Sequence, residues 1–152
     1  MSEPLFRRAR AADLPAIVAM LADDALGQAR EDARVPLDRR YVEAFDAIER
    51  DPNQLLAVAE TDGAVVGCLQ LSFIPGLSRR GMWRGQIESV RIAAEQRGGG
   101  LGRAMFEWAF ATCRARGCGL VQLTTDKTRP DALGFYTALG FVASHEGLKL
   151  AL

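Results

Sequence analysis

The sequence predicts one domain of mixed α/β (α+β) class over residues 1–152, and three observations lead to this prediction. Strand-like and helix-like segments alternate along the chain with no linker between them. Two apolar strands flank Thr61-Asp62-Gly63, a turn sequence typical of an antiparallel hairpin. A strand, a helix and another strand follow over residues 86–124, and a crossover of this length makes its two strands parallel.

The first half of the chain carries helix starts and turn residues. Asp13 can cap a helix that begins around Leu14, and Pro15 falls in the first turn, where its missing N–H costs little. Apolar residues then recur at helical spacing. The elements predicted for this half are a strand at residues 5–8, a helix beginning at 12–15, a polar connection at 28–34, a helix at 37–50, strands at 55–60 and 65–73, and a loop at 75–81.

The second half alternates in the same way. An apolar stripe of Leu101, Met105 and Trp108 predicts a helix, and Gly117 can end that helix in a left-handed conformation. Pro130 suits the first turn of a further helix. The elements predicted here are a strand at residues 86–92, a helix after the glycines at 98–102, a strand at 120–124, a helix from 130 and an edge strand at 148–152, which brings the helices to about four.

Composition excludes several classes of protein. With 152 residues and 49% hydrophobic content, the chain can bury one core. Nineteen basic residues against nineteen acidic ones leave no charge excess of the kind that binds nucleic acid, so no nucleic-acid partner is expected. No window holds the roughly eighteen apolar residues that span a bilayer. We therefore expect no membrane partner and a cytoplasmic location.

Cysteine and histidine residues form no metal-site pattern. Cys68, Cys113 and Cys118 lack the paired spacing of a zinc site, so no metal is expected. Cys68 falls in a strand-like run and Cys113 on the apolar face of a helix, where we expect buried free thiols, with a catalytic thiol as the alternative. His145 is the only histidine, and it follows an apolar pair typical of a strand end.

The stretch Gln96-Arg97-Gly98-Gly99-Gly100-Leu101-Gly102 lies between an apolar strand and an amphipathic helix. Amides at a helix start lack partners within the helix, and glycine lets a phosphate approach without meeting a Cβ. The stretch is no P-loop, because no Lys-Ser or Lys-Thr pair directly follows it, and Lys127-Thr128 has no glycine run before it. It also lacks Gly-x-Gly-x-x-Gly, because Arg103 or Met105 takes the last position. What remains is Arg97-x-x-Gly100-x-Gly102, which predicts a site for a phosphorylated cofactor.

This string resembles the coenzyme A pyrophosphate loop of the GNAT-type N-acetyltransferase superfamily. A second segment, Ala132-Leu133-Gly134-Phe135-Tyr136-Thr137-Ala138-Leu139-Gly140-Phe141, resembles the superfamily's Ala-x-x-Phe/Leu-Tyr-x-x-x-Gly-Phe pattern. The resemblance is close over residues 87–141 and looser over 5–78. It implies a mainly antiparallel sheet with one parallel strand pair at its centre, flanked by helices, and acetyl-CoA as cosubstrate.

The resemblance also implies how acetyl-CoA is held. The two parallel strands splay apart in such folds, and main-chain groups of Val90 and Ile92 would contact the pantetheine arm. Arg129 stands where many members carry asparagine, so it would contact the cofactor differently or face the acceptor. Solvated surface charge is the alternative for the Arg97 and Arg103 side chains. The pyrophosphate would be held by the Arg97 side chain and by the amides of Gly98, Gly99, Gly100, Leu101, Gly102 and Arg103.

Acetyl transfer needs one group that takes a proton from the amine and one that gives a proton to the departing sulfur. Glu88 is the candidate base. Strand alternation places it with Val90 and Ile92 on one side of the sheet, in an apolar run that favours proton uptake by a carboxylate. A structural salt bridge is the alternative for Glu88. Tyr136 is the candidate acid, as the family tyrosine implies, and a packed aromatic is the alternative.

The sequence leaves the acceptor open. The resemblance places its wall at residues 25–41 and 74–84. Acids near this wall (Asp23, Asp24, Glu31, Asp32) could attract a polyamine or aminoglycoside, whereas arginines (Arg79, Arg80, Arg84) could bind a carboxylate or phosphate.

The leading hypothesis is an acetyl-CoA-dependent N-acetyltransferase that acts by direct transfer on a small-molecule or peptide amine. The alternatives are a coenzyme A-binding regulatory or interaction module and a plain α/β domain. A homodimer through the last strands is also expected.

Overall fold

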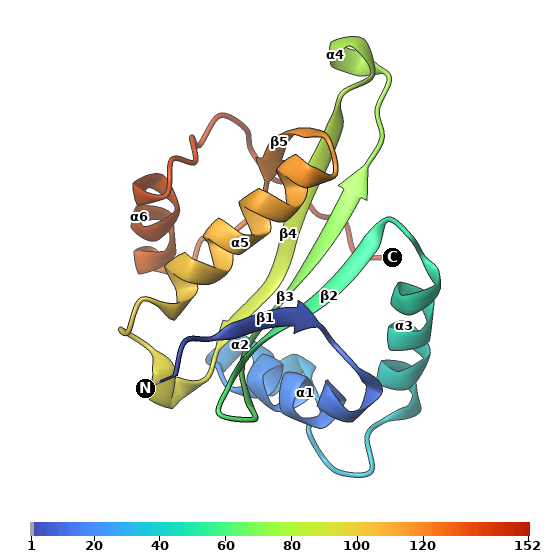
Figure 1. The fold of residues 1–152 in the computed structure, drawn as a ribbon, viewed down its shortest axis with the longest axis vertical. Helices are drawn as coiled ribbons and strands as arrows, with labels where there is room; N and C mark the ends of the chain where they lie inside the picture. The colour runs from blue at the N-terminus through green and yellow to red at the C-terminus, as the bar shows by residue number, and fades with distance from the viewer. Residues whose placement is uncertain (1) are drawn as a thin grey trace.

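The computed structural model describes residues 2–152, which form a five-stranded sheet with helices on both faces (Figure 1). The strands lie in the order β1-β2-β3-β4-β5. Neighbouring strands are antiparallel except β4 and β5, which are parallel, so both the predicted hairpin and the predicted crossover are confirmed. The strands are β1 (Leu5–Arg8), β2 (Gln54–Thr61), β3 (Ala64–Ile74), β4 (Trp83–Ile92) and β5 (Cys118–Gln122).

Six α-helices accompany the sheet in residues 2–152, where about four are expected. The two additions are short: α2 occupies part of the predicted polar connection, and α4 part of the predicted loop. In α4, Arg79 and Arg80 have left-handed φ angles of 56° and 59°, so this element is a tight turn between β3 and β4. The helices are α1 (Leu14–Ala22), α2 (Ala25–Arg30), α3 (Arg39–Arg50), α4 (Ser78–Gly81), α5 (Leu101–Ala115) and α6 (Pro130–Ala138), and short 3-10 turns precede α1 (Ala11–Asp13) and α5 (Ala94–Gln96).

Two apolar clusters lie on opposite faces of the sheet. Leu69 belongs to the cluster that includes Phe106 of α5. Its neighbour Cys68 belongs to the cluster that includes Ile17 of α1 and Phe45 of α3. Successive side chains of a strand point to opposite faces, so β3 contributes to both clusters. The helix that follows the glycines is thereby packed against one face, while the first three helices cover part of the other.

The cysteines are free thiols, and two of them are buried. Cys68 and Cys113 lie in the core, whereas Cys118 is half-buried. Burial raises the pKa of Cys68 to about 12 and the pKa of Cys113 to about 11, so both remain protonated at neutral pH. The prediction of buried thiols is confirmed for these two. Residues 2–152 contain no group of three or more His, Cys, Asp or Glu side chains that could hold a metal ion.

A buried ion network ties β1 to the turn before α1. Arg7 Nη1 donates to Asp13 Oδ2 at 2.7 Å, and Arg7 Nε donates to Glu60 Oε2 at 2.7 Å. The three side chains are 14%, 10% and 23% exposed. Asp13 also accepts the Arg10 N–H at 2.7 Å, and it makes no cap bond to α1. The predicted helix cap at Asp13 is therefore wrong, because Arg7 and the preceding turn already occupy the carboxylate.

The residues after α6 depart from the prediction. Residues 139–152 form no strand, so the edge strand predicted at 148–152 is wrong, as is the strand end at His145. The parallel pair consequently lies at the end of the described sheet and not at its centre. An alternating pattern permits a strand, but a strand also needs a hydrogen-bonded neighbour, which this segment lacks within residues 2–152. Each helix in the same range is too short or too polar to cross a membrane.

Candidate active site

A run of free backbone amides begins α5. Gly98 and Gly100 have left-handed φ angles of 82° and 84°, and a Cβ added at either would meet nothing within 4 Å. The first bond of the helix runs from the Ala104 N–H to Gly100 O at 3.1 Å. Among residues 2–152, no acceptor is bonded to any amide from Gly98 to Arg103. These amides and the positive end of the helix macrodipole can bind a diphosphate, so the loop fits the phosphorylated cofactor that its sequence predicts.

The arginines of this loop are held differently. Arg97 Nε donates to Ile92 O at 3.2 Å, and its Nη2 lies 3.6 Å from Asp23 Oδ2. Arg97 therefore lies at the junction of β4 and the glycine loop. Arg103 Nε lies 3.2 Å from Glu107 Oε1, one turn further along α5. The side chain of Arg103 is thus engaged with its own helix, whereas its amide belongs to the free run.

The two parallel strands separate partway along β4. Their pairing extends from the start of β4 to Gln86, which lies opposite Gln122. Beyond Gln86, β4 continues to Ile92 with no strand of residues 2–152 beside it on this side. This edge includes Val90, whose carbonyl accepts from Arg91 Nη1 at 2.8 Å. A carbonyl oxygen has two lone pairs, so an extended ligand can still bond to this edge.

A cleft of about 1590 Å³ opens beside β4, β5 and α6. Its lining includes Gln86, Val90 and Arg91 of β4 and Tyr136 of α6. The volume is larger than a drug-sized ligand needs, so it can take the reactive end of a cofactor together with a small acceptor. Glu88 and the glycine loop lie outside the lining. The predicted cofactor residues therefore follow β4 from the cleft to the start of α5.

A β-bulge changes the position of Glu88. Gln70 pairs with Glu88, but Cys68 pairs with Arg91, so β4 has one extra residue between these pairs, and Ser89 has a left-handed φ of 56°. The bulge shifts the side-chain alternation, which places Glu88 on the face of Gln70 and Cys68. The prediction that Glu88 shares a face with Val90 and Ile92 is wrong for this reason. Glu88 is also exposed and not enclosed in an apolar run.

Tyr136 is half-buried among aromatic rings. Its ring lies edge-to-face with Phe106 at 5.6 Å and with Phe141 at 5.9 Å between centroids. Burial raises the pKa of Tyr136, while the nearby charges of Arg129 and Arg91 act in the opposite direction. The phenol is therefore protonated at neutral pH, and it lines the cleft. The ring is packed as a core aromatic, and its position in the lining is also compatible with the predicted role as an acid.

Asp24 and Arg91 join this site through contacts that the sequence pattern does not indicate. Asp24 Oδ2 accepts from Arg129 Nη2 at 2.7 Å and lies 3.5 Å from Arg91 Nε. Asp24 Oδ1 accepts the Gly27 N–H at 2.5 Å and so caps α2. The Gly27 bond, followed by the charges of Arg91 and Arg129, lowers the pKa of Asp24. No sequence periodicity could have paired these residues, because Asp24 and Arg129 are 105 positions apart.

The fold and the site together have the features that a long phosphorylated ligand in extended form would need. Free amides at the start of α5 fit the phosphates, and the free edge of β4 fits a chain with amide groups. The sequence matches the model of the acetyltransferase (GNAT) family over residues 19–141, and the chain belongs to this family. Acetyltransferases of the family use acetyl-CoA.

Three known proteins are similar to this chain. It is 32% identical over 112 residues to an aminoalkylphosphonate N-acetyltransferase of Salmonella typhimurium, covering 74% of this chain and 72% of that protein. It is 34% identical over 90 residues to a glucosamine 6-phosphate N-acetyltransferase of Trypanosoma brucei brucei, covering 59% of each protein. A solved structure described as a transcriptional regulator from Bacillus halodurans C-125 is 49% identical, with a TM-score of 0.96, and the match covers 99% of this chain and 100% of that one.

Proposed function

We propose that the protein is an N-acetyltransferase that moves the acetyl group of acetyl-CoA to a primary amine of a small molecule or peptide within a ternary complex. The observation that carries this proposal is the run of unbonded amides from Gly98 to Arg103 at the end of the free β4 edge. This arrangement suits a ligand that has phosphates at one end and an amide-bearing arm leading into the cleft. Family membership supports acetyl transfer, and the two curated relatives are both named as N-acetyltransferases of amines.

Bound acetyl-CoA supplies an activated acetyl group as a thioester. Amides of residues 98–103 would hold its pyrophosphate, with Arg97 beside them. Main-chain groups of Val90 and Ile92 would hold the pantetheine arm along β4. Arg129 would contribute indirectly, because its bond to Asp24 fixes the turn before α2 against the start of α6.

Glu88 is the proposed base for the amine. An alkyl amine with a pKa of ~10.4 is neutral in roughly one molecule in a thousand near pH 7, which costs about 4–5 kcal/mol. Among residues 2–152, no basic side chain is paired with Glu88, which supports a carboxylate that is available to the amine. Because Glu88 lies outside the cleft lining, we propose that a water molecule carries the proton from the amine to it.

Tyr136 is the proposed acid for the sulfur. As the amine nitrogen forms its bond to the acetyl carbon, the carbon–sulfur bond breaks and its electron pair remains on sulfur. The Tyr136 phenol, protonated and in the cleft lining, would give its proton to that sulfur. The positive charges of Arg129 and Arg91 would favour the phenolate left behind.

A second candidate function is a coenzyme A-binding regulatory module that performs no acetyl transfer. Two observations favour it: the solved structure at 49% identity is described as a transcriptional regulator, and Glu88 lies outside the cleft lining. Such a module would use the amides of the α5 start without needing Glu88 or Tyr136.

We also propose a homodimer formed through the C-terminal segment. Leu148, Leu150 and Leu152 are 92%, 86% and 118% exposed, and β5 ends the described sheet with one edge unpaired. A second copy could supply the neighbour that this alternating segment lacks. Light scattering at working concentration tests this proposal, and a monomeric mass contradicts it.

The deciding experiment is a calorimetric titration with acetyl-CoA, followed by a thiol-release assay on the same sample with polyamines, amino acids, amino sugars and peptides. Binding together with turnover on one class supports the enzyme. Binding without turnover on any class supports the regulatory module, and no binding contradicts both. A Glu88→Gln variant with an unreduced kcat would remove Glu88 from the proposed mechanism.

A further inference from the structure

Two of the acids beside the acceptor wall are engaged with arginines that belong to the cofactor region. Asp23 lies 3.6 Å from Arg97. Asp24 accepts from Arg129 at 2.7 Å and lies 3.5 Å from Arg91. Asp24 is therefore neutralised by two guanidinium groups of the chain, while Asp23, which is more exposed, has one arginine beside it.

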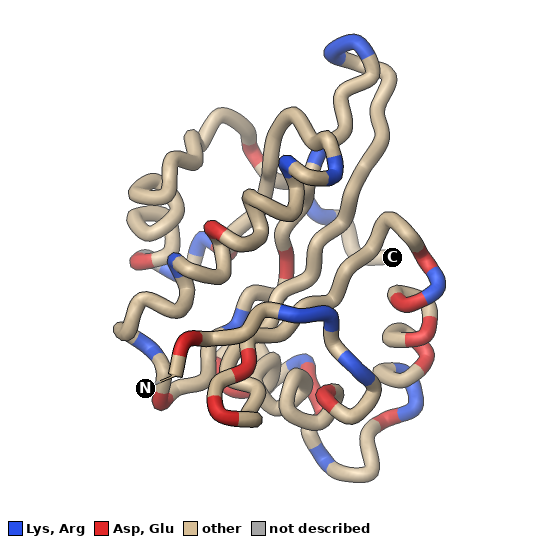
Figure 2. Tube along the Cα trace, viewed as in Figure 1, with Lys and Arg blue, Asp and Glu red and all other residues tan. Residues whose placement is uncertain are grey.

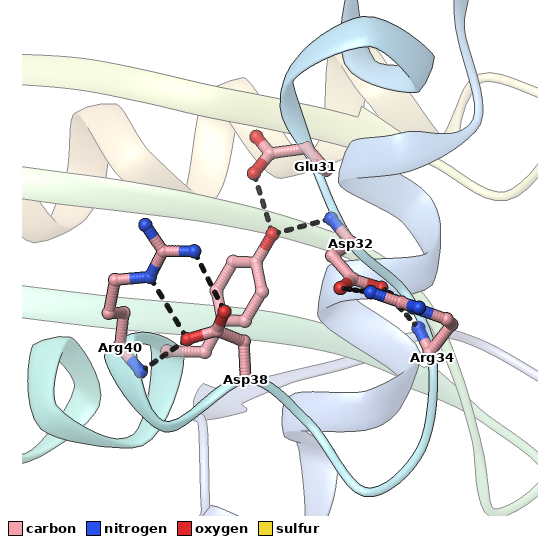
Figure 3. A network of polar contacts seen from close by, with 6 residues as sticks. Glu31, Asp32, Arg34, Asp38 and Arg40 are labelled. Carbon is pink, nitrogen blue, oxygen red and sulfur yellow. Dashed lines mark hydrogen bonds and ion pairs between the residues drawn. The ribbon is translucent and has the colours of Figure 1, made fainter.

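The other two acids, Glu31 and Asp32, are bonded to side chains of α3 and of their own loop (Figure 3). Glu31 Oε1 accepts from the Tyr41 hydroxyl at 2.8 Å. Asp32 accepts from Arg34 Nε at 2.8 Å and from Arg34 Nη2 at 2.6 Å. The bonds from Arg34 lower the pKa of Asp32 to about 2. Asp32 is therefore neutralised by an arginine, whereas Glu31 keeps its charge and is held in place by the Tyr41 hydroxyl.

The arginines of the other wall segment, residues 74–84, have side chains without such partners in residues 2–152. The side chains of Arg79, Arg80 and Arg84 form no ion pair and donate no hydrogen bond to any of residues 2–152. The first two lie in the α4 turn, which is marked blue at the upper end of the molecule in Figure 2. Arg84 is the second residue of β4, and it is half-buried. A half-buried guanidinium without an anion loses solvation that a bound oxyanion would restore.

The charge of the cleft points to the same chemistry. Eight lysine and arginine side chains line it against two acids, Asp126 and Glu146. Three of the eight are paired, Arg91 and Arg129 with Asp24 and Lys127 with Glu146, which still leaves a basic excess. The whole chain has a formal net charge of +0, so this basic excess is local to the cleft. Arg79 and Arg84 are among the lining residues, whereas Arg80 is not. A cleft with this lining concentrates anions from solution.

The position of Arg84 separates it from the cofactor phosphates. The glycine loop follows Ile92, and eight residues of strand at about 3.3 Å each place Arg84 about 26 Å from that end of β4. An anion at Arg84 would therefore belong to the acceptor and not to the pyrophosphate of coenzyme A.

Arg84 also shares one face of β4 with Gln86 and Glu88. Pairing with β3 places all three on the same side, before the bulge at Ser89. The middle residue is fixed, because Gln86 Oε1 accepts from Gln122 Nε2 at 2.9 Å. The row therefore has a cation at one end, amides in the middle and a carboxylate at the other end, about 13 Å away along the strand. Such a row is complementary to a molecule with an ammonium group and an oxyanion separated by several bonds.

On the basis of the proposed acetyltransferase function, we infer that the acceptor is an amine that also carries an oxyanion (a phosphate, phosphonate or carboxylate), and that Arg84 binds this oxyanion. The structure thus favours the arginine alternative for acceptor recognition over the polyamine alternative that the sequence leaves open. Arg84 is a specificity residue in this inference: it holds the acceptor and takes no part in the proton transfers.

The test compares acceptors in matched pairs. Glucosamine 6-phosphate is measured against glucosamine, 3-aminopropylphosphonate against propylamine, and 4-aminobutyrate against butylamine, with spermidine as the polycation. We expect the anionic member of at least one pair to have a kcat/KM about 10- to 100-fold higher, as for a charge-assisted bond, and the pair that responds identifies the oxyanion. Equal use of both members in every pair, or preference for spermidine, would overturn the inference.

Variants of Arg84 test whether this residue causes the preference for anionic acceptors. Arg84→Gln should raise KM for the anionic acceptor about 10-fold or more, with little change for its uncharged partner or for acetyl-CoA binding, and Arg84→Lys should recover part of the loss. Arg50→Gln is the matched control, because Arg50 is an exposed arginine at the end of α3, outside the cleft lining. A preference that survives in Arg84→Gln contradicts the assignment.

A binding experiment separates this inference from the proposed function. The anionic acceptors are titrated calorimetrically into the protein saturated with coenzyme A, for wild type and for Arg84→Gln. If no acceptor is acetylated, the proposed function fails, yet anion binding that is lost in Arg84→Gln would still support the oxyanion site. If neither turnover nor Arg84-dependent binding is found, both the proposed function and the oxyanion site are rejected.

Discussion

Arg129, the residue before α6, donates from Nη2 to Asp24 Oδ2 at 2.7 Å, and so it joins the start of α6 to the start of α2. The same carboxylate lies 3.5 Å from Arg91 of β4 and caps α2 through the Gly27 N–H. One acid therefore connects three elements that border the cleft. Its loss should loosen the wall between cofactor and acceptor more than the loss of an exposed ion pair would.

Two variants of Asp24 separate the contribution of its charge from that of its bond to the Gly27 N–H. Asp24→Asn keeps an oxygen for the Gly27 N–H but loses the charge, whereas Asp24→Ala loses both. We expect Asp24→Ala to be less stable than Asp24→Asn by about 1 kcal/mol, the usual value of an N-cap. Thermal and denaturant unfolding of both variants measure the difference. Equal stability of the two would mean that the Gly27 bond contributes nothing to stability.

Gly100→Ala tests the anion site at the start of α5. The left-handed φ of 84° makes any side chain there unfavourable by about 1–2 kcal/mol, although no atom lies within 4 Å of the new Cβ. We expect this loss of stability together with an acetyl-CoA affinity weakened about 10-fold or more, because the methyl group would occupy the space that a phosphate approaches. Calorimetry measures the affinity.

Gly63→Ala is the matched control for that variant. Gly63 lies in the β2–β3 turn with a φ of 80°, and a Cβ there also meets nothing within 4 Å. It should lose similar stability while binding acetyl-CoA as the wild type does. Parallel losses of affinity in both variants would show that Gly100 acts through stability and not through the ligand.

Tyr136→Phe removes the proposed acid and keeps the ring that packs against Phe106 and Phe141. We expect kcat to fall about 100-fold, the usual effect of losing a general acid, while acetyl-CoA affinity and melting temperature change little. Steady-state kinetics with the true acceptor, alongside calorimetry, provide both readings. A rate equal to that of the wild type would reject the acid role and leave Tyr136 as a packing residue.

The Arg7–Asp13 pair should make stability depend on pH. The bonds from Arg7, and next the Arg10 N–H, lower the pKa of Asp13 below its ordinary value of 3.8. A carboxyl group with a lowered pKa stabilises the fold above its unfolded pKa, and this contribution is lost as the pH falls through the lower, folded pKa. We expect Asp13→Asn to cost about 2 kcal/mol at pH 6, because Arg7 remains buried with Glu60 alone. The difference from wild type should shrink below pH 4.

Denaturant unfolding of both proteins between pH 2.5 and pH 6, values chosen to lie about the ordinary pKa, measures this dependence. Asp46→Asn serves as the control, since Asp46 is exposed on α3 and its substitution should leave the pH profile unchanged. A gap between wild type and Asp13→Asn that stays constant across this range would mean that Asp13 keeps its ordinary ionisation in the folded state.

Much of the fold could be predicted because its signals are local. The Asp62-Gly63 turn indicated the hairpin, and the apolar stripe on α5 indicated the crossover helix. The free amides at the start of α5 also follow from local chemistry, since the first N–H groups of a helix have no partner within it and the Gly100 N-cap has no side chain to bond them. The face of Glu88 could not be predicted in this way. It depends on a bulge at Ser89, and a bulge arises from the pairing of β4 with β3.

By itself, the sequence determined the α/β class, the glycine loop, the free thiols and the arginines and acids that border the acceptor wall, because these depend on residue type and short-range spacing. Only the tertiary structure decided which charges are satisfied: Asp24 meets Arg129 across 105 positions, whereas Arg84 meets no acid in residues 2–152. It also decided that residues 148–152 have no neighbouring strand. Ion pairing and strand pairing both require two distant segments to meet in space, and a pattern along one segment carries no information about its partner.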